Sequence, residues 1–196
     1  MTIRPVAVLI GPPGAGKSTV GPMLADLLGT SFLDTDEIVA GEAGKPVGDI
    51  FIEDGEGAFR ALERAAVARA LASHPGVLGL GGGAVLDEGT RKLLAGQRVV
   101  YLRTGFAAAA RRVGLGAPRP LLAVNPRAQL KELLAQRLPI YESLAWVTTD
   151  TDDREPAGIA AELAAALAAE MAAESGEGAG TSPDPDPGVP PDPPAP

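Results

Sequence analysis

The chain has 196 residues, of which 45% are hydrophobic, and a formal net charge of −8. This length suits one domain with a sizeable core and is too short for two ordinary ones. Because there is no cysteine and His74 is the single histidine, disulfides, thiolate metal sites, histidine metal clusters and Ser-His catalysis are excluded. Any acid–base chemistry must therefore come from carboxylates, lysine or tyrosine.

Short apolar runs alternate along the chain with segments of helical spacing. The predicted strands cover residues 6–10, 31–33, 76–80, 98–102 and 146–148. The predicted helices cover residues 19–28, 47–53, 57–73, 87–95, 106–112, 127–138 and 156–173. This alternation predicts an α/β fold of three layers, a five-stranded parallel sheet with helices on both faces. Ligands of such sheets bind beyond the carboxyl ends of the strands.

Two segments differ in composition from the rest. Residues 114–126 are rich in Gly and Pro, which excludes a long regular element there. From residue 174 the chain is acidic and then Pro-rich, with eight prolines in its last 14 residues. We therefore expect a folded domain over 1–173 and a disordered tail over 174–196.

Charge and hydropathy also limit the partners and the location. Five acids and no base lie from residue 174 onward, which leaves a net charge of −3 on residues 1–173. So mild a charge gives no sign of a nucleic-acid partner. The apolar run at residues 6–10 is too short for a signal-peptide core or a membrane span. We expect a cytoplasmic monomer with no membrane partner.

The loop after the first predicted strand carries the most specific motif of the chain. Gly11-Pro-Pro-Gly-Ala-Gly-Lys-Ser18 matches the G-x-x-x-x-G-K-[ST] phosphate loop, between a strand and a helix as that loop requires. Backbone N–H groups from Gly14 onward would cradle the phosphates, Lys17 would reach the β- and γ-phosphates, and the Ser18 hydroxyl would bind Mg²⁺. The motif indicates a nucleoside triphosphate and leaves the reaction open.

Three further features lie near the ends of predicted strands or early in a helix. Asp34 and Asp36 follow the second strand, where one carboxylate can serve Mg²⁺ and the other an acceptor hydroxyl; the alternative is a helix N-cap with an acidic first turn. Arg60, early in a predicted helix, is a candidate for binding an anionic acceptor. The alternative is a solvated ion pair with Glu63, three residues later. The triple glycine at residues 81–83 favours close approach of a ligand to the backbone, with a plain turn as the alternative.

In this order the motifs resemble those of the shikimate kinases. The matching segments are Gly11–Ser18, Asp34-Thr-Asp36, Gly55-Glu-Gly-Ala-Phe-Arg60, Gly81-Gly-Gly83, Arg119-Pro-Leu-Leu122 and Arg137-Leu-Pro-Ile-Tyr141. The resemblance covers residues 5–172. It implies a P-loop kinase that transfers the γ-phosphate of ATP to the 3-hydroxyl of shikimate, with one Mg²⁺ ion as cofactor. It also implies that the Gly- and Pro-rich segment 114–126 is a mobile lid, with a static surface loop as the alternative.

The resemblance also implies a role for each matched residue. Asp36 would bind the shikimate hydroxyls and accept a proton, and Asp34 would hold Mg²⁺ together with Ser18. Arg60 and Arg137 would bind the shikimate carboxylate, and the backbone of Gly82 and Gly83 would bind the ring substituents. Lys17 and Arg119 would contact the transferring phosphate. The residues that would bind ATP are Gly14, Ala15, Gly16, Lys17, Ser18, Thr19, Arg112, Arg119 and Arg154.

Two other functions remain open from the residues alone. The first is a kinase of the same fold that acts on another small molecule, such as gluconate or a nucleoside monophosphate. The second is a degenerate nucleotide-binding module that regulates a partner. The acceptor assayed in solution distinguishes the first, and ATP binding without turnover would indicate the second.

Overall fold

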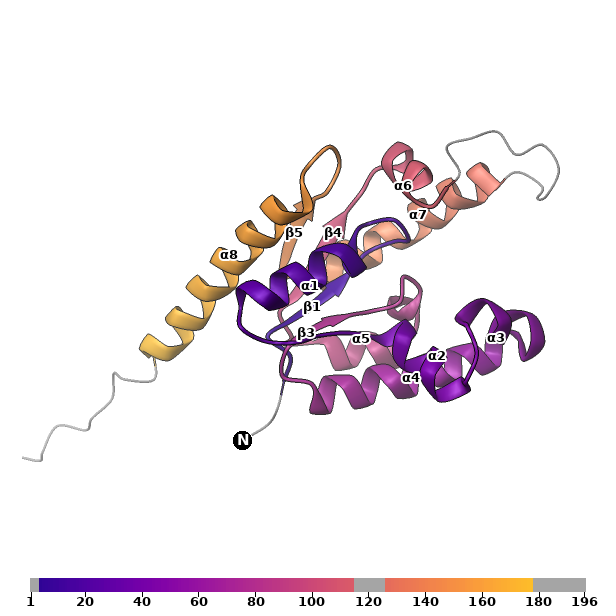
Figure 1. Cartoon of the computed structure of the whole chain (residues 1–196), viewed down its shortest axis with the longest axis horizontal. Coiled ribbons are helices and arrows are strands. Elements are labelled where there is room, and N and C mark those ends of the chain that lie inside the picture. The colour runs from indigo at the N-terminus through magenta and orange to yellow at the C-terminus, as the bar shows by residue number, and fades with distance from the viewer. Residues whose placement is uncertain (1–3, 115–125, 178–196) are drawn as a thin grey trace, which may run out of the picture.

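The computed structural model describes residues 4–114 and 126–177. At its centre lies a sheet of five parallel strands in the order β2-β3-β1-β4-β5 (Figure 1). The strands are β1 (Ala7–Ile10), β2 (Phe32–Asp34), β3 (Val77–Gly79), β4 (Val99–Arg103) and β5 (Val147–Asp150). The predicted five-stranded parallel sheet is confirmed, and each strand lies within two residues of its predicted bounds.

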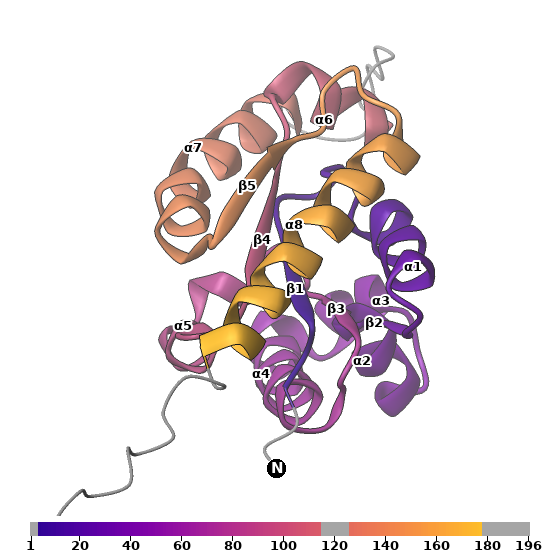
Figure 2. The ribbon, with the colours of Figure 1, turned by 90° about the vertical axis from the view of Figure 1, so that its left-hand side faces the viewer.

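The two faces of the sheet take alternate side chains of the same strands. In β1, Leu9 belongs to one core cluster and Val8 to the other, and both are fully buried, as the two-residue period of a strand requires. On the Leu9 face pack α1 (Lys17–Leu27) and α8 (Pro156–Glu177). Figure 2 shows α8 crossing in front of β1 and β4.

The opposite face is covered by α4 (Gly55–Ser73), α5 (Glu88–Leu94) and α7 (Pro126–Leu144). A smaller core joins α2 (Thr35–Ala43) and α3 (Val47–Glu53) to the start of α4, around Val39, Ile50 and Phe59. The described residues also include the single-turn helix η1 (Ala84–Leu86) and α6 (Phe106–Arg112). Helices therefore lie on both faces, which completes the three layers that the sequence predicts.

Several helices differ from the prediction. Helix α1 begins at Lys17, two residues early, and α2 was not predicted because its residues show little amphipathic spacing. Helix α7 does not stop before Pro139 but continues to Leu144. A proline inside a helix costs about 3 kcal/mol. Burial of Tyr141 and packing of Leu144 against the core offset that cost.

Helix α8 extends to Glu177, beyond the predicted end at Ala173. Over the described residues it is the one helix long and apolar enough, by length and composition alone, to cross a membrane. Its side chains Ile159, Leu163 and Leu167 are buried in the core shared with α1 and the sheet. Packing within the domain therefore accounts for these three side chains.

The last turns of α8 are attached to the body by an ion-pair cluster. The Glu174 carboxylate accepts from Arg98 at 2.5 Å and from Arg4 at 3.1 Å. The Arg98 side chain is only 11% exposed, and its Nε is buried without a partner among the described residues. Glu174 thus balances a mostly buried cation, which an exposed pair would not do.

We expect Glu174→Gln to lower the free energy of unfolding by about 1–2 kcal/mol, because it leaves the Arg98 charge uncompensated. Urea denaturation of the full chain measures this. Glu170→Gln is the matched control, since Glu170 lies one turn earlier on α8 and has no ion pair among the described residues. An equal loss in both variants would mean that the cluster contributes nothing specific.

Candidate active site

The loop between β1 and α1 has a backbone shape that glycine makes accessible. Gly11 has φ +149°, and a Cβ there would lie 2.6 Å from the Leu102 carbonyl oxygen. Gly16 is the N-cap of α1 at φ +94°, in the left-handed region, where a side chain is strained. No side chain caps α1. The Thr19 N–H donates to the Gly16 carbonyl, which leaves the N–H groups of Lys17 and Ser18 for an anion.

Lys17 stands at the start of α1 and folds back over this loop. Its Nζ donates to the carbonyl oxygen of Gly11 at 2.7 Å and to that of Pro12 at 3.2 Å. Burial lowers the pKa of Lys17 to about 8, although the nearby Asp34 and Asp36 carboxylates act to raise it. The ammonium group is therefore held above the loop as a poorly solvated cation, which favours an incoming anion.

Asp34, at the end of β2, makes hydrogen bonds to both α1 and α2. Its Oδ2 accepts from the Ser18 hydroxyl at 3.2 Å, and its Oδ1 accepts from the Asp36 backbone N–H at 2.9 Å as the N-cap of α2. The N-cap alternative is therefore correct for Asp34, and the same carboxylate also faces Ser18. The acidic first turn of α2 contains Asp36 and Glu37.

Asp36 faces the triple-glycine turn that follows β3. A Cβ on Gly81 would lie 2.5 Å from Asp36 Oδ1 and 2.8 Å from Glu63 Oε1, so both carboxylates lie directly against this glycine. Burial, and then the Asp34 charge, raise the pKa of Asp36. Asp36 and Lys17 line the main cavity, of about 420 Å³, which brings the phosphate loop and a carboxylate with a raised pKa to the same space.

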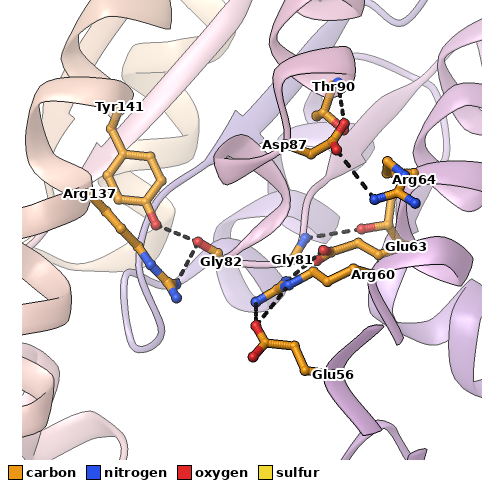
Figure 3. A network of polar contacts seen from close by, with 11 residues as sticks. Glu56, Arg60, Glu63, Arg64, Gly81, Gly82, Asp87, Thr90, Arg137 and Tyr141 are labelled. Carbon is orange, nitrogen blue, oxygen red and sulfur yellow. Dashed lines mark hydrogen bonds and ion pairs between the residues drawn. The ribbon is translucent and has the colours of Figure 1, made fainter. Parts of the chain in front are cut away.

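Arg60 lies over the other side of the same turn. Its Nη1 donates to Glu63 at 2.7 Å, its Nη2 donates to Glu56 at 3.2 Å, and a Cβ on Gly83 would lie 2.5 Å from Nη1 (Figure 3). Glu63 is 2% exposed, so the solvated ion pair is wrong and a buried one replaces it. Burial raises the pKa of Glu63 against the opposing effect of Arg60.

Helix α7 reaches the turn from the opposite side. The Gly82 carbonyl oxygen accepts from Arg137 Nη1 at 2.9 Å and from the Tyr141 hydroxyl at 2.6 Å. In Figure 3, Gly82 lies between these two side chains and Arg60. The two arginines predicted to hold one carboxylate thus lie on either side of the Gly81–Gly83 turn.

Arg112 closes the side of the loop away from this turn. Its guanidinium donates to the Gly14 carbonyl at 3.1 Å and to the Thr151 hydroxyl at 2.9 Å, and it lines both the main cavity and a second one of about 260 Å³. Arg154 lines the second cavity and pairs with Glu162. The second cavity begins at Gly16 and Thr19, where a nucleotide base or sugar would follow the phosphates.

Most of the predicted site residues come together in this way. The main cavity is lined by Gly14, Gly16, Lys17, Ser18, Thr19, Asp34, Asp36, Gly82 and Arg112. Ala15 lines the second cavity and is fully buried. Arg119 and nearly all of the predicted lid at 114–126 lie outside the described residues, as does most of the predicted tail.

Three residues of the site were not assigned a role from the sequence. Thr35 is fully buried, and its hydroxyl accepts from the Gly81 N–H at 3.0 Å. Glu63 holds Arg60, and Tyr141 holds the Gly82 carbonyl. The motif that ends at Tyr141 was recognised, but its partner lies 59 residues away, so only the fold shows the contact.

A phosphate loop at the carboxyl end of the central strand, beside a glycine turn flanked by two arginines and a carboxylate, defines a P-loop small-molecule phosphotransferase. The family model described as shikimate kinase matches residues 13–168. The chain belongs to the shikimate kinase family.

Individual relatives agree with this membership. A shikimate kinase of Thermobifida fusca is 64% identical over 83% of this chain and 94% of its own length. One of Salinispora arenicola is 62% identical over 82% and 96%. The solved shikimate kinase of Acinetobacter baumannii in complex with shikimate is 34% identical, with a TM-score of 0.78 over 86% of this chain and 95% of that one.

The lowered pKa of Lys17 predicts how nucleotide affinity depends on pH. Below about pH 8 the free protein already carries the ammonium cation, and affinity for ATP is flat. Above it, binding must take up a proton, because the phosphates raise the pKa of Lys17, and affinity falls up to about tenfold per pH unit. Calorimetry at pH 7 and pH 9 in two buffers of different ionisation enthalpy measures this uptake. Zero uptake at pH 9 would contradict the prediction.

Proposed function

We propose that this protein transfers the γ-phosphate of ATP to the 3-hydroxyl of shikimate, giving 3-phosphoshikimate and ADP. The observation that carries the proposal is the Gly81–Gly83 turn, which lies between Arg60 and Arg137 and faces Asp36. Asp36 in turn shares its cavity with the phosphate loop. A compact polyhydroxy carboxylate matches this set of groups, since it needs cations at one end and hydrogen bonds at the other.

On the acceptor side, Arg60 and Arg137 hold the carboxylate. A guanidinium can offer two parallel N–H groups to a carboxylate. Glu56 and Glu63 hold Arg60 through Nε, Nη2 and Nη1, which leaves one N–H on each terminal nitrogen for a ligand. The backbone N–H groups of Gly82 and Gly83 serve the ring substituents. Asp36 binds the hydroxyl that is phosphorylated and accepts its proton, a role that its raised pKa favours.

On the donor side, the loop from Gly14 to Thr19 cradles the phosphates, and Lys17 neutralises the β- and γ-phosphate charge. Arg119 adds a second cation at the transferring phosphate. Arg112 and Arg154 border the cavity that continues from the loop, and they hold the adenosine portion. Phosphoryl transfer then depends on alignment of the acceptor hydroxyl with the γ-phosphate and on charge neutralisation.

Ser18 and Asp34 fit one Mg²⁺ ion that arrives with ATP. Their side-chain oxygens lie 3.2 Å apart, and both are the hard oxygen ligands that Mg²⁺ takes in small number while it keeps several waters. The described residues contain no cluster of three or more His, Cys, Asp or Glu that would hold a metal by itself. The ion supplies charge neutralisation on the phosphates when bound.

The test is release of ADP by the purified full chain with Mg-ATP, with shikimate, gluconate or AMP as acceptor at equal concentration. We expect release with shikimate at least about a hundredfold above the other two, because buried groups left unpaired by the wrong acceptor cost several kcal/mol. A higher rate with gluconate or AMP would mean that this compound, and not shikimate, is the acceptor. Tight ATP binding without turnover on any of the three would favour a regulatory module.

The remaining assignments stay predictions. Light scattering of the purified chain tests the prediction that it is a monomer. Fractionation of cells that express it tests the prediction of a cytoplasmic location.

A further inference from the structure

The Gly82 carbonyl oxygen lies in the middle of the acceptor side and has two donors, both from α7. The Tyr141 hydroxyl donates at 2.6 Å and Arg137 Nη1 at 2.9 Å. A carbonyl oxygen has two lone pairs, so these donors saturate it. Tyr141 is 1% exposed, and its hydroxyl donates to this backbone group beside the Arg137 guanidinium, which also interacts with it.

We propose that Tyr141 is a positioning residue for the acceptor: its hydroxyl fixes the plane of the Gly82–Gly83 peptide, and thereby aims the Gly83 N–H at the substrate. This inference rests on the proposed function, in which that N–H binds the acceptor. It assigns no contact between Tyr141 and the substrate.

The geometry follows from the planarity of the peptide. In a trans peptide the C=O of one residue and the N–H of the next point in opposite directions. Because the Gly82 C=O points toward α7, the Gly83 N–H points away from α7, toward the side where Arg60 lies (Figure 3). Glycine allows many backbone orientations, so three glycines in a row need an external constraint to hold one of them.

Arg137 alone is a poor source of that constraint. In the proposed function its guanidinium also serves the acceptor carboxylate, so part of its donor set turns to the substrate. Tyr141 has no such second task. Its ring is stacked on Tyr101 with centroids 5.1 Å apart, and Tyr101 is 2% exposed. Burial raises the pKa of Tyr141 to about 12, so the phenol keeps its proton and remains a donor throughout the working pH range.

The test compares Tyr141→Phe with Tyr101→Phe. The first removes one hydroxyl from the buried stack and keeps the ring, and the second removes a hydroxyl from the other ring of the same stack without touching Gly82. We expect Tyr141→Phe to raise KM for the acceptor about five- to tenfold, the size of one lost hydrogen bond. Because the N–H binds ground state and transition state alike, kcat and KM for ATP should change less than twofold. Tyr101→Phe should leave all three unchanged.

The acceptor in these assays is whichever compound supports ADP release by the wild type, so a failure of shikimate contradicts the proposed function and leaves this comparison intact. A second readout does not need turnover: the rise in thermal midpoint that the acceptor induces should be smaller in Tyr141→Phe than in Tyr101→Phe. An unchanged acceptor KM in Tyr141→Phe would overturn the inference. Equal changes in both variants would also overturn it. So would a lower kcat together with higher KM values for both substrates, because that pattern indicates a merely structural role.

Discussion

Asp36→Asn is expected to lower kcat by about 10²–10⁴-fold, the usual contribution of a positioned acid–base group. The carboxylate lines the cavity that contains Lys17 and lies against the Gly81 backbone, where an acceptor hydroxyl would meet the γ-phosphate. Asparagine keeps the size and can still hydrogen-bond, but it cannot take a proton. Steady-state kinetics with saturating ATP and acceptor measure the loss.

Stability separates this loss from damage to the fold. The pKa of Asp36 is raised, so at a pH above that pKa the ionised carboxylate lowers the stability of the folded protein. The neutral amide removes this cost. The thermal midpoint of Asp36→Asn at pH 7.5 should therefore equal or exceed that of the wild type. Asp26→Asn, on the exposed side of α1, is the control and should leave kcat unchanged. Wild-type turnover in Asp36→Asn would show that phosphoryl transfer here needs no base, as a loose transition state permits.

The sequence predicted those parts of the site whose causes are local. A strand, a glycine loop and a helix follow one another over residues 7–27, and the spacing within them fixes where Lys17 and Ser18 lie relative to the backbone. The parallel sheet then brings the ends of β1, β2 and β3 to one edge. Alternating strands and helices suffice to predict that arrangement.

What the sequence did not predict depends on neighbours distant in the chain. Glu63 reads as one of many surface acids on a helix, and only the packing of α4 against the triple-glycine turn makes it a buried partner of Arg60. Pro139 reads as the end of a helix, yet α7 continues because Tyr141 fills a place in the core. Burial of a single polar side chain is a tertiary property, and periodicity carries little information about it.

Lys17→Met is expected to lower kcat by at least about 10²–10³-fold, as when one preorganised charge-stabilising donor is removed. The lysine Nζ already lies over the phosphate loop, held by the Gly11 and Pro12 carbonyls, so the protein has arranged this cation before ATP binds. Methionine fills nearly the same volume and cannot neutralise the phosphates. The affinity for ATP, measured by calorimetry, should fall with kcat, since the same cation contacts the ground state.

The fold should tolerate this change. The pKa of Lys17 is lowered to about 8 by burial, so at pH 7 the ammonium is held in the folded protein at a cost that methionine removes, and the thermal midpoint should be unchanged or higher. Lys92→Met is the control, because Lys92 is exposed on α5 and pairs only with Glu88 among the described residues. If Lys17→Met retained kcat and ATP affinity while Lys92→Met did the same, the cation over the loop would not be what binds the phosphates. The site would then have to rely on backbone N–H groups and arginines for that charge.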